Sequence, residues 1–168
     1  MVELSYDFNR SIGYHVHMTA RTYQKALSQE LAAHGITLPQ FVVVLSLIHW
    51  GEGLIQAELA DLLRVEGPSL ARLLDRMEAA GWVERRASPS DRRAKRIFFG
   101  PKAKELWPLM RECALDINAT ARQGVGEEEI AQCLRTLERI RQNLTGRVEP
   151  EAPLERKEGR RLGVASSL

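Results

Sequence analysis

The chain has 168 residues, of which 44% are apolar, and its 24 basic and 22 acidic side chains leave a net charge of +2. This length fits one compact domain with appendages. The longest strongly apolar run, from Phe41 to Trp50, falls well short of the ~18 to 20 residues that a bilayer-spanning helix needs. The acidic start of the chain lacks the basic and apolar segments of a secretory signal or transit peptide. We therefore expect a cytoplasmic protein with no membrane partner.

A long first helix is predicted over the segment 9–33, where apolar residues recur every three or four positions. Gly35 follows as a helix stop. Tyr14, Met18 and Arg21 share a second face about half a turn away from the first. Because neither face is fully polar, we expect this helix to have two packing partners.

The next part of the chain predicts a helix-turn-helix. A capping box at its start opens a second helix over 37–50, and Gly51 ends it. A short amphipathic helix over 56–63 is joined by a tight connection, 64–67, to a further helix over 68–80. In this last helix, Leu70, Leu73, Leu74 and Met77 form one face, and Ser69, Arg72 and Arg76 line another.

A β-hairpin follows directly, with strands over 82–86 and 96–99 and turn residues between them. A hairpin in this position is a wing. The stretch from Arg85 to Arg96 holds six basic residues against one acid, Asp91. A charge run of this kind is often only a solvated loop.

Two more helices complete the chain. The first begins at Pro101, since proline is favoured at a first helical position, and runs to about Arg122. The last begins with the three glutamates 127–129, which suit a helix N-terminus. A narrow apolar stripe on the last helix is typical of a helix–helix seam and comprises Ile130, Leu134, Leu137, Ile140 and Leu144. The tail, 147–168, is polar and contains proline, and we expect it to be mobile.

A basic hairpin beside a helix that presents Ser69, Arg72 and Arg76 suits duplex DNA. A helix fits the major groove, where arginine pairs with guanine edges or phosphates. The wing would reach an adjacent minor groove, where a narrow A·T-rich segment attracts arginine. The alternative is a winged-helix interaction module whose basic wing binds an acidic protein partner.

The stretch from Gln56 to Arg96 closely resembles the MarR family of winged-helix transcriptional regulators, and within it the SlyA type. The resemblance extends over residues 8–146, and its most diagnostic part is Asp91-Arg92-Arg93-Ala94-Lys95-Arg96. It implies a homodimer whose first and last helices interlock. It also implies two winged lobes that read a pseudo-palindromic operator in neighbouring major grooves.

The resemblance also implies roles for single residues. Pro68, Ser69 and Arg72 match the recognition-helix contacts, and Arg92 matches the wing-tip arginine. Asp91 matches an internal brace, whose carboxylate would accept hydrogen bonds from arginines. The predicted DNA contacts are Pro68, Ser69, Arg72, Arg76, Arg92 and Arg93, with Asp91 and Arg96 supporting the wing. At the wing exit the chain has Phe99-Gly100-Pro101 and Ala103, where the family commonly has a Leu-Thr pair and a later glycine.

Control by a small aromatic or phenolic acid is a further implication of the resemblance. Tyr14, Met18, Arg21, Phe41 and Leu45 would line an apolar pocket with one cation for a carboxylate. The alternative is ordinary interhelical packing with Arg21 in solvent. A second alternative is an aromatic acyl-CoA, whose phosphates would meet Arg10, Arg21 and Lys25.

Catalysis, cofactors and metals find no support in the sequence. There is no glycine-rich phosphate loop and no Gly-x-Ser-x-Gly elbow. His15 and His17 would project about 200° apart on a helix, which prevents joint chelation. Cys113 and Cys133 are expected to be reduced core thiols. The first helix has no cysteine of the kind that senses oxidants in the best-known redox regulators of the family.

These observations predict a mainly α fold with a small β-hairpin wing, a winged helix-turn-helix with long terminal dimerisation helices. Residues 1–36 and 101–146 would form the dimerisation region, and residues 37–100 the DNA-binding lobe. The expected function is a ligand-released transcriptional regulator, a repressor rather than an enzyme.

Overall fold

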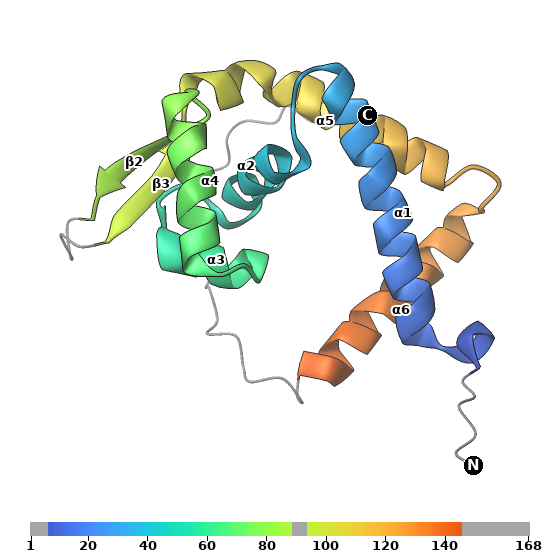
Figure 1. Ribbon diagram of the computed structural model, residues 1–168. Coiled ribbons are helices and arrows are strands. Elements are labelled where there is room, and N and C mark those ends of the chain that lie inside the picture. The colour runs from blue at the N-terminus through green and yellow to red at the C-terminus, as the bar shows by residue number, and fades with distance from the viewer. Residues whose placement is uncertain (1–6, 89–93, 146–168) are drawn as a thin grey trace, which may run out of the picture.

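The computed structural model describes residues 7–88 and 94–145 (Figure 1). The predicted wing-tip residues Asp91, Arg92 and Arg93 and the tail 147–168 therefore lie outside the described residues. The helices are η1 Phe8–Arg10, α1 Ile12–Ala33, α2 Leu38–Trp50, α3 Gln56–Leu63, α4 Gly67–Ala79, α5 Pro101–Ala121 and α6 Glu127–Thr145. The strands are β1 Leu54–Ile55, β2 Val83–Ala87 and β3 Lys95–Phe99. The mainly helical fold and the hairpin wing are as the sequence predicts.

The helix boundaries follow local capping chemistry. The capping box at the start of α2 is confirmed, because the backbone N–H of Thr37 donates to Gln40 Oε1 at 2.8 Å and the backbone N–H of Gln40 donates to Thr37 Oγ1 at 3.4 Å. The prediction of one continuous first helix from residue 9 was wrong at its start. Ser11 accepts a hydrogen bond from the backbone N–H of Tyr14 at 3.2 Å and caps α1, so the preceding turn forms the separate helix η1.

The sheet contains a strand, β1, that the sequence analysis missed. The strand order in the sheet is β1-β3-β2, and both strand pairs are antiparallel. In β1, Leu54 lies opposite Ile97, and the two-residue strand runs directly into α3. A strand of this length has no alternating pattern that could be recognised in a sequence.

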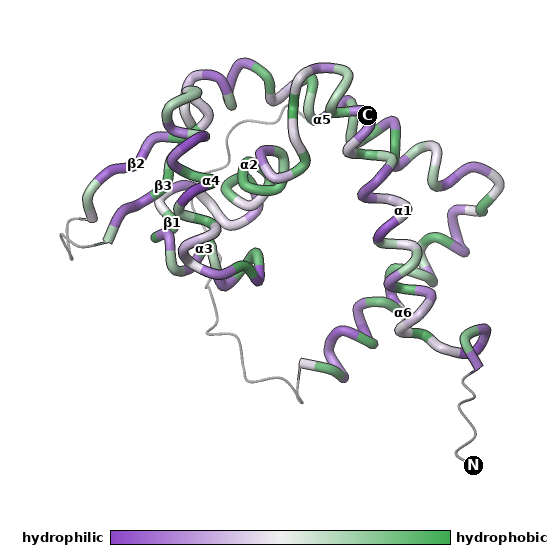
Figure 2. The backbone as a smooth tube through the Cα atoms, in the orientation of Figure 1, coloured by the Kyte–Doolittle hydropathy of each residue, from purple (hydrophilic) through white to green (hydrophobic). Residues whose placement is uncertain are grey.

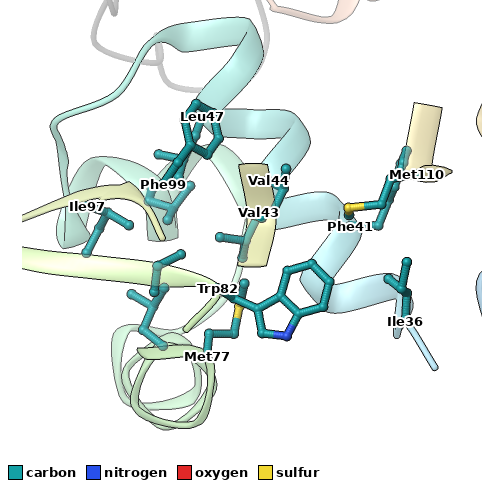
Figure 3. Close-up of a cluster of buried hydrophobic side chains, with 14 of the residues drawn as sticks. Ile36, Phe41, Val43, Val44, Leu47, Met77, Trp82, Ile97, Phe99 and Met110 are labelled. Atoms are coloured by element: carbon teal, nitrogen blue, oxygen red, sulfur yellow. The ribbon is translucent and has the colours of Figure 1, made fainter. Parts of the chain in front are cut away.

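The core lies inside the lobe formed by α2, α3, α4 and the sheet, and α1 and α5 cover one side of it. Trp82 is buried at the end of α4, with Met77, Val43 and Phe41 drawn around it in Figure 3. Figure 2 shows α2 as mostly hydrophobic inside this lobe. By contrast, no residue of α6 is buried. The prediction of a core thiol was therefore wrong for Cys133 on this helix, whereas Cys113 on α5 is buried. Among the residues that the structure describes, the apolar stripe of α6 is therefore left largely uncovered.

Within the described ranges, no single helix is long and apolar enough to cross a membrane, and only α1 and α2 together, bent by 101° at their junction, meet that criterion by length and composition.

The wing exit has its own packing, which explains the unusual Phe99-Gly100-Pro101 sequence. The N–H of Gly100 donates to the Trp82 carbonyl at 2.9 Å. A Cβ atom at Gly100 would lie 2.2 Å from the carbonyl oxygen of Gly81. Gly81 itself has φ +76°, a conformation that favours glycine. The two glycines let the end of α4 and the start of α5 approach closely, which fixes α5 against the lobe.

We expect Gly100→Ala to destabilise the protein by about 1–3 kcal/mol, because the added methyl group overlaps backbone atoms that cannot rotate away. Chemical denaturation monitored by tryptophan fluorescence measures this loss. Gly67→Ala is the matched control, since a Cβ atom there meets nothing within 4 Å. Equal stability of the two variants would show that the backbone moves apart easily at the wing exit.

Candidate nucleic-acid interface

The exposed face of α4 carries four of the six residues that the sequence assigned to DNA. Pro68, Ser69, Arg72 and Arg76 are all exposed, and the opposite face is buried through Leu70, Leu74 and Met77. The Nε atom of Arg72 donates to the Pro68 carbonyl at 3.4 Å, so its side chain lies back over the first helical turn. The structure thus brings these four predicted residues onto one solvent-facing surface next to the hairpin.

Arg85 in β2 locks the hairpin to α4. Its Nη2 atom lies 2.6 Å from Asp75 Oδ1 and 2.6 Å from Glu78 Oε2, and its Nε donates to Glu78 Oε2 at 2.8 Å. The backbone N–H of Arg85 also donates to Glu78 Oε1 at 3.0 Å. The Arg85 side chain is only 12% exposed. We call Asp75, Glu78 and Arg85 the Arg85 clamp.

The clamp changes the charge of the α4 surface. Asp75 is an exposed carboxylate on the same helix as Arg72 and Arg76, where a free carboxylate would repel phosphate, and its ion pair with Arg85 offsets that charge. The hydrogen bond from Arg85 lowers the pKa of the Glu78 carboxyl, and the same bond raises the pKa of Arg85. Because the folded-state pKa of Glu78 is lowered, the stability from this pair is present at neutral pH and is lost as the pH falls through that lowered pKa.

Arg96 in β3 holds the base of the hairpin. Its Nη1 donates to the Gly53 carbonyl at 2.7 Å, and its Nε donates to Ser88 Oγ at 3.2 Å. Ser88 is buried, and its backbone N–H donates to the Ala94 carbonyl at 2.9 Å. These contacts join β3 to the segment before β1 and to the end of β2. The sequence assigned Arg96 to wing support, and these contacts lie at the base of the hairpin.

The basic run from Arg85 to Arg96 is less positive than its sequence indicates. Arg85 is paired with the clamp acids, and Arg86 Nη2 lies 2.7 Å from Glu84 Oε2. Arg86 also stacks on Phe98, with its guanidinium carbon 4.3 Å from the ring centroid. The charge count over residues 85–96 left out Asp75, Glu78 and Glu84, because all three precede this segment in the sequence. Two of the six basic residues of the run are thus paired with acids.

The sequence analysis missed the clamp because it joins residues of a helix to a strand across a turn. Asp75 and Glu78 are three residues apart on α4, a spacing that signals a shared helix face. Only the angle between α4 and β2 shows that Arg85 reaches both.

The five residues predicted to bind an effector are dispersed in the single chain. Phe41 belongs to the core and is 4% exposed, whereas Leu45 on α2 is exposed. Tyr14 lies near the start of α1, where its ring contacts Phe8 with the centroids 5.2 Å apart. Met18 lines a recess of about 400 Å³ between α1 and α5, and Arg21 is exposed. None of the other four residues lines that recess.

A helix-turn-helix followed by a hairpin wing, with arginines on the exposed face of its second helix, defines a winged-helix DNA-binding protein. Residues 36–95 match the MarR family. The chain is 36% identical to transcriptional regulator PA3341, with a TM-score of 0.73 and coverage of 81% of this chain and 99% of that chain. The chain belongs to the MarR family of DNA-binding transcriptional regulators.

Two further solved structures share the fold. The transcriptional regulator SlyA is 28% identical, with a TM-score of 0.71 and coverage of 82% of this chain and 96% of that chain. The transcriptional repressor CouR, solved bound to a 23-mer DNA duplex, is 23% identical, with a TM-score of 0.72 and coverage of 83% of this chain and 99% of that chain.

Proposed function

We propose that the protein is a homodimeric repressor that binds a pseudo-palindromic operator. In this proposal it regulates transcription through DNA binding and does not catalyse a reaction. The observation that carries this proposal is the exposed face of α4, where Ser69, Arg72 and Arg76 lie beside a hairpin held by the Arg85 clamp. In this proposal α4 enters the major groove, and Arg92 and Arg93 enter the adjacent minor groove. Repression follows because a regulator that covers promoter DNA excludes other proteins from it. CouR, a repressor of the same fold, supports this comparison.

We also propose that separate parts of the chain bind DNA and form the dimer. Residues 37–100 would form the DNA-binding lobe, and residues 1–36 and 101–146 would form the dimerisation region. Recognition helices of a dimer meet half-sites about one helical turn, ~34 Å, apart. A helical region that fixes the distance between the lobes therefore determines whether both can bind.

Exposed apolar side chains support a dimer through the terminal helices. Leu134 is 62% exposed and Leu137 is 43% exposed on α6, and Leu144 continues the same stripe. On α1, Ile12 and Val16 are also exposed. Apolar surface of this extent is stabilised by burial against a partner, and a second copy of the chain offers the same stripe.

We expect the double variant Leu134→Glu/Leu137→Glu to be monomeric, because it would place charges in the proposed interface. Sedimentation velocity measures the mass, and fluorescence anisotropy measures the loss of operator binding. Ile48→Glu, at an exposed apolar position of α2, is the matched control. A dimeric double variant would place the interface elsewhere.

The proposal includes release by a small aromatic or phenolic acid or an aromatic acyl-CoA. A ligand shifts the separation of the two lobes only by as much as its affinity differs between the two states. The recess between α1 and α5, which includes Met18, Tyr23 and Ile117, supports a ligand site near the base of the dimer. Displacement of labelled operator by a series of aromatic acids and their coenzyme A thioesters tests this part.

A further inference from the structure

Three side chains with different metal-ligand chemistry meet where α1 packs on α5. Glu30 lies in the last turn of α1, His34 caps that helix, and Cys113 comes from α5. Their ligand atoms, a carboxylate oxygen, an imidazole nitrogen and the thiol sulfur, all lie within 4.8 Å of one another. Glu30 and His34 are four residues apart, which places them on the same side of the helix. The sequence alone did not bring His34 together with Cys113, because they are far apart along the chain.

The burial and the interaction partners of these three side chains leave them available to bind a ligand. Cys113 is only 2% exposed, whereas Glu30 and His34 are exposed. Neither the Glu30 carboxylate nor the His34 ring makes a hydrogen bond or an ion pair with another residue in the described ranges. Burial raises the pKa of the Cys113 thiol, and the nearby Glu30, Asp116 and Glu112 carboxylates raise it further. The surroundings of the sulfur are thus negative, which favours a bound cation.

We propose that Glu30, His34 and Cys113 form a binding site for a divalent cation of the zinc type. Thiolate, imidazole and carboxylate are the ligands of Zn²⁺, with bond lengths of about 2.0–2.3 Å. Adjacent ligands of a tetrahedral site with these bonds are about 3.3–3.8 Å apart. The exposed side chains of Glu30 and His34 can rotate to close the remaining distance to the fixed sulfur. Calcium and magnesium prefer all-oxygen sites and do not fit a thiol donor.

The position of the site links two parts of the fold. Leu31 follows Glu30, Ile36 follows His34 by two residues, and Met110 precedes Cys113 by one turn; all three belong to the core. A bound cation would therefore cross-link α1 to α5 where the helical arm joins the DNA-binding lobe. Three protein ligands would leave the fourth position of the ion open to water, unlike structural zinc sites, which are closed by four protein ligands. This inference does not depend on the operator or the effector.

Titration of the full-length, reduced protein with Co²⁺ tests the site directly. A cobalt ion bound to a thiolate shows a near-ultraviolet charge-transfer band, and Zn²⁺ should displace it. We expect one equivalent per chain, and loss of the band in Cys113→Ser. Glu30→Gln and His34→Gln should each weaken Co²⁺ binding at least about tenfold. Cys133→Ser is the matched control, because Cys133 is the other, exposed cysteine, and it should bind like wild type.

Thermal unfolding gives a second readout. At the same concentration, Zn²⁺ should raise the Tm of wild type and of Cys133→Ser by mass action, and should raise that of Glu30→Gln or His34→Gln clearly less. Both of these substitutions are at exposed positions, so they keep the test valid if Cys113→Ser fails to fold. The inference is overturned if wild type shows no band, if the band depends on Cys133 instead, or if Glu30→Gln and His34→Gln bind Co²⁺ like wild type.

Discussion

Replacing Arg85 with alanine is expected to weaken operator binding more than about tenfold and to lower the free energy of unfolding by about 1.5–3 kcal/mol. The side chain is nearly buried and joins β2 to both Asp75 and Glu78 on α4. Its removal frees the hairpin to move relative to the recognition helix. It also leaves Asp75 without its ion pair, and Glu78 keeps only the hydrogen bond from the backbone N–H of residue 85. The unpaired Asp75 carboxylate would then repel DNA phosphates near the arginines of α4.

Arg86→Ala is the matched control for this experiment. It removes the same charge from the next residue of β2, but Arg86 is 60% exposed and its ion pair with Glu84 is a surface pair. Such pairs contribute about 0–1 kcal/mol. Denaturation curves and operator anisotropy of the two variants should therefore differ clearly. If Arg85→Ala is no less stable than Arg86→Ala, the clamp does not hold the wing.

Arg72→Ala is expected to lower operator affinity about 10–100-fold while leaving the fold intact, because one arginine contact to a base edge contributes about 1–3 kcal/mol of discrimination. Arg72 is exposed, and within the described residues its side chain donates a hydrogen bond to the carbonyl of Pro68 in the same helix. The preference for operator over a scrambled duplex should fall as well. Anisotropy titrations of both duplexes measure this difference.

Lys104→Ala provides the control for charge alone, since Lys104 is exposed on α5 rather than on α4. It should bind operator like wild type.

Arg92→Ala, at the predicted wing tip, should weaken operator binding without changing stability. Wild-type affinity in both Arg72→Ala and Arg92→Ala would mean that the assignment of DNA contacts is wrong.

Features set by local chemistry could be predicted from the sequence. The capping box at Thr37 and Gln40, the prolines at the first turns of α2, α4 and α5, and the exposed arginines of α4 all depend on neighbouring residues. The hairpin was equally predictable, because its strands are long enough to show their pattern.

Features that join distant segments could not be predicted. The pairing of β1 with β3, the Arg85 clamp and the close approach of Gly100 to Gly81 each depend on the angle between two elements. The juxtaposition of Glu30 and His34 with Cys113 depends in the same way on how α1 crosses α5. Periodicity assigns residues to a face of a helix, but it does not say which other face they meet.

The central claim, that α4 and the wing form a DNA-binding surface, is tested most directly by fluorescence anisotropy over a range of salt concentrations. The duplex is the DNA upstream of the protein's own gene, and a scrambled duplex is the control. The account predicts saturable binding that prefers the native fragment, with log affinity falling by about 0.9 per phosphate contact for each tenfold rise in salt. Failure to bind either duplex even at low salt would contradict it and would favour an acidic protein as the partner of the wing.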